Sequence, residues 1–325
     1  MMITLCTVSV FSAHALAVVI PAGSVDALAA AIAEAGPGGE VVLAAGQHKI
    51  SGTVIVDIPV SIVGEEGAIL ESSNATADGE DTSLYYVKPA LHIVGADRTR
   101  IENLIIQAPA DANVAANAGI VIESAANVQI VDNQILGHLN GILVEQGDSA
   151  LLKGNTVQTT KDGIIVINGS GVSIQDNWLS CGRFGMWIGG KYGDISGNMM
   201  QGNYIGLLLC SPRKFVISGE VRELETAGTG YLVYQNNAVG NAWGYLAFDG
   251  ASNNTLMNND AAFNTSYDIE LGGESTRFGL VTPTSYNNTV IQGLKYQGLK
   301  VKVCGVDNKA LGHINLVDNV EDPCF

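Results

Sequence analysis

Apolar residues in this chain recur two positions apart, in runs of three to five residues, with Gly or Asn between the runs. This alternation is typical of short β-strands, because successive side chains of a strand point to opposite faces. No window shows the i, i+3, i+4, i+7 stripe of an amphipathic helix over a helix length. The pattern predicts an all-β fold, with one short Ala-rich helix that starts at Ser24, its expected N-cap, and ends at Ala35.

The strand runs repeat with a period of 22 or 21 residues. The repeat is marked by a Gly that opens an apolar run, at Gly119, Gly141, Gly163, Gly185 and Gly206, and by an Asn that keeps step with it, at Asn133, Asn155, Asn177 and Asn198. Self-similarity at this period indicates a solenoid, in which each coil buries its inner face against its neighbours. We expect Asn155 and Asn177 to be buried in a bend and hydrogen-bonded along the stack.

The repeat resembles the right-handed parallel β-helix of the pectin-lyase-like superfamily. The stretch from Val18 to Leu70 is similar to the family's entry, in which the short helix plugs the open end of the coil. The resemblance implies a single-stranded right-handed parallel β-helix of ~22-residue coils. Residues 18–325 would form this one domain, with loop insertions near residues 78–88, 107–118, 222–229 and 273–286, where the register breaks.

Residues 1–17 predict a signal peptide. The segment is apolar from Ile3 to Phe11 and ends in an A-x-A pattern at Ala15 to Ala17, although an ordinary buried segment is the alternative. No other stretch approaches the ~18 apolar residues of a membrane span. We therefore expect a secreted or periplasmic protein, in which Cys304 and Cys324 can form a disulfide that closes the C-terminal tail.

The net charge excludes one class of partner. Lys and Arg number 16 against 32 Asp and Glu, which gives a formal net charge of −16. A nucleic-acid-binding surface needs clustered cations, so no nucleic-acid partner is expected.

Motifs of characterised activities in the superfamily are missing from the sequence. The Asn-Thr-Asp, Asp-Asp, Gly-His-Gly and Arg-x-Lys segments of polygalacturonases do not occur, and neither do the motifs of pectate lyases and alginate epimerases. The resemblance therefore implies only a protein that binds or degrades an extracellular polysaccharide, as a lyase or hydrolase if it is active. The alternative is a non-catalytic scaffold or surface protein that mediates protein–protein contacts.

Outward-facing positions supply the candidate binding residues. Alternation places Glu123 and Glu145 side by side on adjacent coils, where they would share a cation such as Ca²⁺ or stand as two solvated acids. The neighbouring outward row is apolar and consists of Val121, Leu143, Ile165, Trp187, Leu208 and Leu246, followed by Glu270. A loop or the tail would cover this row; alternatively it forms a homo-oligomer interface or a sugar platform centred on Trp187.

The candidate catalytic residues lie at the end of the same face. Asp268 and Glu270 precede the insertion that holds Arg277. A lyase could use the arginine to neutralise a uronate carboxylate and a carboxylate base to remove the adjacent proton. The alternative is a loop salt bridge that caps the final coil.

Overall fold

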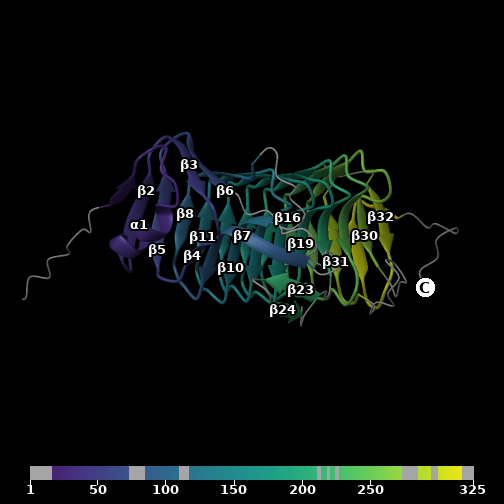
Figure 1. Ribbon diagram of the computed structural model, residues 1–325. Coiled ribbons are helices and arrows are strands. Elements are labelled where there is room, and N and C mark those ends of the chain that lie inside the picture. Colours follow the sequence, from purple (N-terminus) through teal and green to yellow (C-terminus); the bar gives the residue numbers. More distant parts are fainter. Residues whose placement is uncertain are drawn as a thin grey trace, which may run out of the picture.

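The computed structural model describes residues 17–72, 85–109, 117–210, 214–217, 220–223, 227–272, 285–293 and 299–316. In these ranges the chain winds into an elongated right-handed parallel β-helix, with the N-terminal coils at one end and the C-terminal coils at the other (Figure 1). Three sheets run along the axis. The fold class predicted from the repeat is confirmed.

Most coils contribute one short strand to each sheet. Sheet 1 contains β1 (Val18–Ile20), β2 (Gly39–Leu43), β5 (Val60–Gly64), β8 (Arg100–Glu102), β11 (Gln129–Val131), β14 (Leu151–Lys153), β17 (Ser173–Gln175), β20 (Asp194–Ser196), β25 (Leu232–Tyr234), β28 (Thr255–Met257), β31 (Thr289–Gln292) and β33 (Lys309–Gly312). Sheet 2 contains β3 (Gly46–Ile50), β6 (Ala68–Ser72), β9 (Ile105–Gln107), β12 (Gln134–Leu136), β15 (Thr156–Thr159), β18 (Trp178–Cys181), β21 (Met199–Gln201), β26 (Asn237–Val239) and β29 (Asp260–Ala262).

Sheet 3 carries the face that concerns function. It contains β4 (Val54–Val56), β7 (Tyr85–Val94), β10 (Asn117–Glu123), β13 (Asn140–Glu145), β16 (Asp162–Ile167), β19 (Phe184–Ile188), β22 (Ile205–Leu209), β23 (Lys214–Ile217), β24 (Glu220–Glu223), β27 (Trp243–Ala247), β30 (Ile269–Leu271), β32 (Lys300–Val303) and β34 (Asn315–Leu316). Neighbouring coils pair in parallel, whereas β23 and β24 form an antiparallel hairpin.

The core is a stack of identical positions. In sheet 3 the inward residues Ile120, Ile142 and Ile164 pair across adjacent strands, and each is fully buried. The repeated Gly beside them is required by close packing: a Cβ on Gly141 would lie 2.4 Å from the carbonyl oxygen of Gly163. Apolar stacking and the Gly positions together keep successive coils in register.

An asparagine ladder runs through the bend between sheets 1 and 2, as expected. Asn155 and Asn177 are each 1% exposed. The Asn155 side chain donates to the Ile130 carbonyl at 2.8 Å and to Asn177 Oδ1 at 2.9 Å, while Asn155 Oδ1 accepts from the Asn133 backbone at 3.1 Å. The ladder therefore satisfies backbone groups that the bend leaves out of the sheets.

The N-terminal helix is shorter than predicted. Helix α1 spans Leu28–Ala35, its N-cap is Ala27, and no side chain caps it, so Ser24 as N-cap was wrong. Ser24 instead donates its hydroxyl to the Pro21 carbonyl, and Asp26 accepts bonds from Ser51. These contacts keep the chain non-helical up to Ala27. The helix covers the N-terminal end of the coil (Figure 1).

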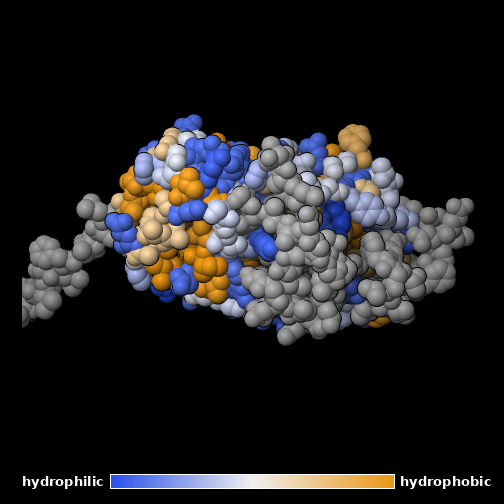
Figure 2. Space-filling model, in the orientation of Figure 1, coloured by the Kyte–Doolittle hydropathy of each residue, from blue (hydrophilic) through white to orange (hydrophobic). Residues whose placement is uncertain are grey.

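Parts of the expected insertions form strand. Residues 85–88 belong to β7 and residues 222–223 to β24, while residues 273–284 lie outside the described residues. Within the described residues, no helix is long and apolar enough to cross a membrane. Apolar side chains are visible toward the N-terminal end of the face in Figure 2, and exposed apolar residues of those coils include Val19, Val25 and Ile55.

The ladder predicts a specific loss of stability. Replacing Asn155 by Ala removes two donated bonds and leaves the Asn133 N–H unpaired in a buried bend, so the free energy of unfolding should fall by roughly 1–3 kcal/mol. Urea denaturation measures this loss. Asn237→Ala is the matched control, because the Asn237 side chain is partly exposed and its Oδ1 has no partner. Equal stability of the Asn155 variant and the parent protein would contradict the ladder.

The pairing state of the cysteines predicts how many thiols of the protein react with a thiol reagent. Cys304 is disulfide-bonded, and Cys181 and Cys210 are free thiols, whereas the expected partner Cys324 lies outside the described residues. Protein made under oxidising conditions and unfolded without reductant should therefore show two reactive thiols, or three if residues 1–17 are retained. A reactive Cys304 or Cys324 in peptide mapping would disprove the expected bridge.

Candidate functional site

The outer face of sheet 3 carries the predicted apolar row. Strand pairing places Val121, Leu143, Ile165, Trp187, Leu208 and Leu246 in one line that continues to Glu270. These six apolar residues are only 0–2% exposed, and with their neighbours they form a hydrophobic cluster separate from the coil interior. The row is therefore covered rather than bare.

A strap made by residues 85–87, β23 and β24 crosses this face. Residues 88–94 of β7 pair with β10, but residues 85–87 pair with β23, which follows β22 in the chain. In the sheet, β7 and β22 are five strand steps apart, or ~24 Å. The two segments can meet only by running toward each other over the intervening strands, and Figure 1 shows β7 crossing in front of them.

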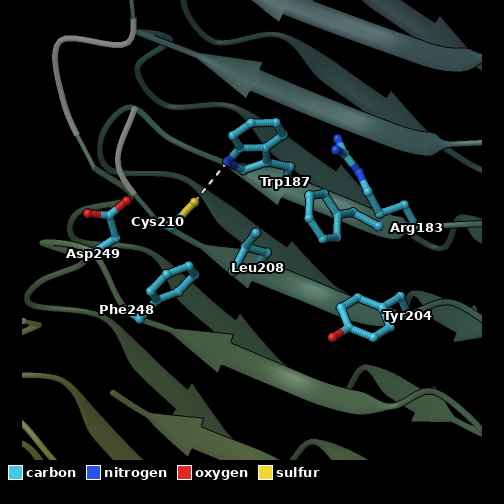
Figure 3. A pocket seen from close by; sticks show the side chains of 8 residues that line it. Arg183, Trp187, Tyr204, Leu208, Cys210, Phe248 and Asp249 are labelled. Carbon is cyan, nitrogen blue, oxygen red and sulfur yellow. Dashed lines mark hydrogen bonds between the residues drawn. The ribbon is translucent and has the colours of Figure 1, made fainter. Parts of the chain in front are cut away.

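Beside the row, the outer face is hollowed into a cavity of about 130 Å³. An engineered apolar cavity of ~150 Å³ accepts a benzene ring, so this one has room for about one ring. The cavity spans β19, β22 and β27 with their flanking turns (Figure 3). Half of its lining residues are aromatic; the lining consists of Arg183, Phe184, Trp187, Tyr204, Leu208, Cys210, Phe248 and Asp249.

The aromatic walls are held in place by specific contacts. Phe184 and Trp187 meet edge to face with ring centroids 5.6 Å apart, and Trp187 Nε1 donates to the Cys210 sulfur at 2.9 Å (Figure 3). Tyr204 is 44% exposed. Its ring packs edge to face on the Trp243 ring, with the two ring centroids 5.2 Å apart. The cavity thus has rigid aromatic sides and one accessible tyrosine at its rim.

Arg183 is fixed beside these aromatic rings by a buried acid. Its guanidinium lies 4.2 Å from the Phe184 ring centroid and donates from both Nε, at 2.9 Å, and Nη2 to the carboxylate of Asp162, which is 0% exposed. Burial raises the pKa of Asp162, and the Arg183 charge opposes that rise. Burial, with the Arg183 charge, also lowers the pKa of the neighbouring Lys161 to about 8. This is a preorganised ion pair at the cavity wall.

The expected catalytic carboxylates occupy structured positions. Glu270 is 3% exposed; it accepts from Trp243 Nε1 at 3.0 Å and lies 3.9 Å from Lys302 Nζ. Asp268 accepts from the Asn264 side chain and from the Lys300 backbone, which links the last coils. Arg277 lies outside the described residues. The structure therefore places Glu270 in the outer row and Asp268 in a ladder bend.

The two expected metal-binding acids are adjacent, as predicted. Glu123 pairs with Glu145 across β10 and β13. Glu123 also lies 2.8 Å from His92 Nε2, and Glu145 is 1% exposed. Within the described residues, no group of three or more His, Cys, Asp or Glu side chains is arranged to hold a metal ion. Calcium binding by this pair stays a prediction.

Two polar side chains at the start of β13, His138 just before the strand and Asn140 within it, are enclosed. His138 is fully buried and Asn140 is 1% exposed, and among the described residues neither the imidazole nitrogens nor the amide atoms have a hydrogen-bond partner. Burial lowers the pKa of His138 to about 4, so the ring is neutral at physiological pH.

Sequence reasoning found part of this site. Trp187 and the apolar row were predicted, whereas Trp243, which also packs on the outer cluster, was not. Phe184 stands three positions before Trp187, in the outward line of Asp162 and Ile205. Alternation puts residues three positions apart on opposite faces, so it predicts Phe184 inward and could not have located the cavity.

Comparison with known families places the chain among β-helix proteins. The model for "Periplasmic copper-binding protein (NosD)" matches residues 38–215, and the model for "Right handed beta helix region" matches residues 140–320. Each match covers more than half of the chain. The chain therefore belongs to the right-handed β-helix family, and it also matches the NosD family model. No curated protein matches the chain in sequence.

Solved structures with the same fold are distant in sequence. A family 28 exopolygalacturonase from Yersinia enterocolitica is 12% identical, with a TM-score of 0.59 over 88% of this chain and 65% of the other. A polygalacturonase from Erwinia carotovora is 14% identical, with a TM-score of 0.56 over 92% and 96%. The Dettilon tailspike protein is 12% identical, with a TM-score of 0.54 over 90% of this chain and 62% of its own. The chain thus spans less than two thirds of two of these proteins.

The buried histidine predicts a pH dependence of stability. The pKa of His138 is lowered in the folded state, so the unfolded chain binds the extra proton between about pH 6.5 and pH 4, and stability must fall as pH falls through this window. The loss should be on the order of 3 kcal/mol.

Denaturation curves of the parent protein and His138→Gln, measured from about pH 7 to pH 4, test this; the variant should lose less stability on acidification. His313→Gln, at an exposed histidine, is the control. Identical slopes for the parent and the His138 variant would contradict the assignment.

Proposed function

We propose that this protein binds an extracellular polysaccharide on the outer face of sheet 3, with one sugar ring seated in the aromatic cavity. The observation that carries the proposal is the cavity itself, whose aromatic walls stand beside Arg183 and Asp249. Apolar sugar faces pack on aromatic rings, while charged and polar groups at the rim orient the hydroxyls. The two polygalacturonases of similar fold support a polysaccharide as the ligand class.

Catalysis, as a lyase or hydrolase, remains part of the proposal. Glu270 is the candidate acid or base, because it is a buried carboxylate on the same face, three strands from β19. Trp243 and Lys302 hold it in one orientation, which general acid–base chemistry requires. Asp268 and Arg277 complete the candidate set. Glu123 and Glu145 extend the binding surface toward the N-terminal coils.

The scaffold alternative has less support. An interaction surface made by the apolar row would need that row to be exposed, yet its six residues are 0–2% exposed. Association of two copies through the apolar row would require displacement of the strap that crosses it. We therefore place a homo-oligomer contact through this stripe second to ligand binding.

The copper named in one family description does not fit the described donor set. Copper sites use histidine, cysteine or methionine in combination. Here Cys210 accepts from Trp187, His92 contacts Glu123, and no group of three His, Cys, Asp or Glu side chains that could hold a metal occurs in the described part of the chain. The proposal assigns no copper site.

We also propose that the protein is exported to the periplasm or secreted. The apolar segment that ends at Ala17, the Cys304 disulfide and the periplasmic family description are consistent with this location.

The cavity predicts a localised loss of binding. Tyr204→Ala removes the accessible aromatic wall and should weaken binding of a recognised polysaccharide about tenfold, equivalent to ~1.4 kcal/mol. Affinity electrophoresis in polysaccharide-containing gels measures the change. Tyr192→Ala is the matched control, because Tyr192 is 67% exposed but lies in a turn away from the cavity. If both variants lose affinity equally, or neither does, the cavity is not the binding site.

A further inference from the structure

We infer that Phe263 is a second sugar-binding platform, which lies beyond the aromatic cavity at the bend between sheets 2 and 3. Phe263 directly follows β29 of sheet 2, and β30 of sheet 3 comes next in the chain. The inference rests on the proposed function and extends it, because it says where a bound polysaccharide continues after the ring in the cavity.

The side chain of Phe263 is almost completely exposed. Its exposed fraction is 87%, the highest among the large apolar side chains in the described part of the chain. A single apolar side chain on a protein surface is common and needs no explanation by itself. However, a ring that buries so little area adds little to the stability of the fold, so packing does not account for this phenylalanine.

The backbone at Phe263 has a conformation that phenylalanine disfavours. Its φ is +59°, in the left-handed region, where the Cβ of an L-residue crowds the following carbonyl oxygen. The register of β21, β26 and β29 makes Gly202 and Gly240 the equivalent residues of the two preceding coils. Both have positive φ, +71° and +65°, which glycine adopts without this penalty. Phe263 therefore carries local strain, and strain of this kind concentrates at functional sites.

The surface beside Phe263 is open. A Cβ added to Gly202 or to Gly240 would meet no described atom within 4 Å. The Phe263 ring therefore does not lie over the preceding coil, and the two glycines leave room for a ligand on the cavity side of the ring.

Tyr192 shows that an aromatic side chain in the same backbone conformation can serve the fold instead. Its φ is +55°, and it lies in the turn between β19 and β20. A Cβ added to Gly230 of the next coil would lie 2.7 Å from the Tyr192 ring, so this ring covers backbone of that coil. The strain at Tyr192 thus has a structural reason, which the open surface beside Phe263 does not provide.

Phe263 lies on the same bend as Tyr204, the accessible aromatic residue at the cavity rim. Tyr204 follows Asn203 in the chain, and Phe263 precedes Asn264. Side-chain amides join Asn203 to Asn241 and Asn241 to Asn264, so Phe263 is two coil steps beyond Tyr204, or roughly 10 Å along the axis. A polysaccharide that leaves the cavity past Tyr204 can therefore place the apolar face of a later sugar on the Phe263 ring.

The test uses the full-length protein and Phe263→Gly, which removes the ring and suits the backbone conformation. Polygalacturonate, alginate, galactomannan, xylan and dextran are the probes in affinity electrophoresis. We expect the affinity for the polymer that the parent protein binds to fall about tenfold, equivalent to ~1.4 kcal/mol. The melting temperature should stay the same or rise, because glycine relieves the strain.

Three further variants make the test specific to a flat ring at this position. Phe263→Trp keeps a flat ring and should keep the parent affinity, whereas Phe263→Leu keeps only apolar area and should lose about as much as Phe263→Gly. Tyr192→Gly is the matched control, because it removes another exposed aromatic side chain at positive φ, in a turn away from the cavity. Its affinity should equal that of the parent protein.

Full affinity in Phe263→Gly, together with weaker binding by Tyr204→Ala, would overturn this inference and leave the proposed function standing. A lower melting temperature of Phe263→Gly would also overturn it, because the ring would then stabilise the fold. Parent-like affinity in Phe263→Leu would contradict stacking of a sugar on the ring. Binding of none of the five polymers by the parent protein would count against the proposed function itself, and the inference would fall with it.

Discussion

Stacking of coils at the spacing of paired strands is the constraint on which the rest of this structure depends. Each inward Ile, Val or Leu contacts its counterparts above and below, and the Asn ladder closes the bend where the backbone leaves the sheets. Once the register is set, every outward side chain has a determined position along the axis. The outer face of sheet 3 is therefore as well defined as the core, although a strap crosses it.

The outer face of sheet 3 carries a second buried hydrophobic cluster, which is interrupted by one cavity. Apolar and aromatic side chains from six successive strands, β10 to β27 with their flanking turns, pack into a cluster that the strap crosses. The interruption is the aromatic cavity, and Arg183 at its wall is paired with Asp162. A surface of this kind excludes water from flat apolar walls while keeping polar groups oriented at its rim. These properties support the proposal that a sugar polymer binds along the solenoid axis.

The fold was predictable because it repeats. A 22-residue period, a Gly that admits no Cβ and an Asn at a buried bend are local signals that recur in each coil, so each one reinforces the others. The helix start was not predictable in the same way. Ser24 has the chemistry of an N-cap, but Val25 bridges to Lys49 and Asp26 bonds to Ser51, and these tertiary contacts delay the helix until Leu28.

The site was only partly predictable, since it depends on contacts between coils that the repeat does not encode. Alternation placed Trp187 and Glu270 on the outer face, but it could not show that Asp162 would hold Arg183 or that Trp243 would hold Glu270. Those contacts depend on side-chain directions across strands. The Tyr85–Val87 pairing with β23 joins segments about 130 residues apart, which no periodicity reveals.

A crystal structure of the protein soaked with an oligosaccharide tests the central claim most directly. The account predicts one sugar ring in the cavity between Phe184, Trp187 and Tyr204, with neighbouring rings extending along the outer face of sheet 3. An ordered oligosaccharide on sheet 1 or sheet 2, with the cavity free of sugar, would contradict it.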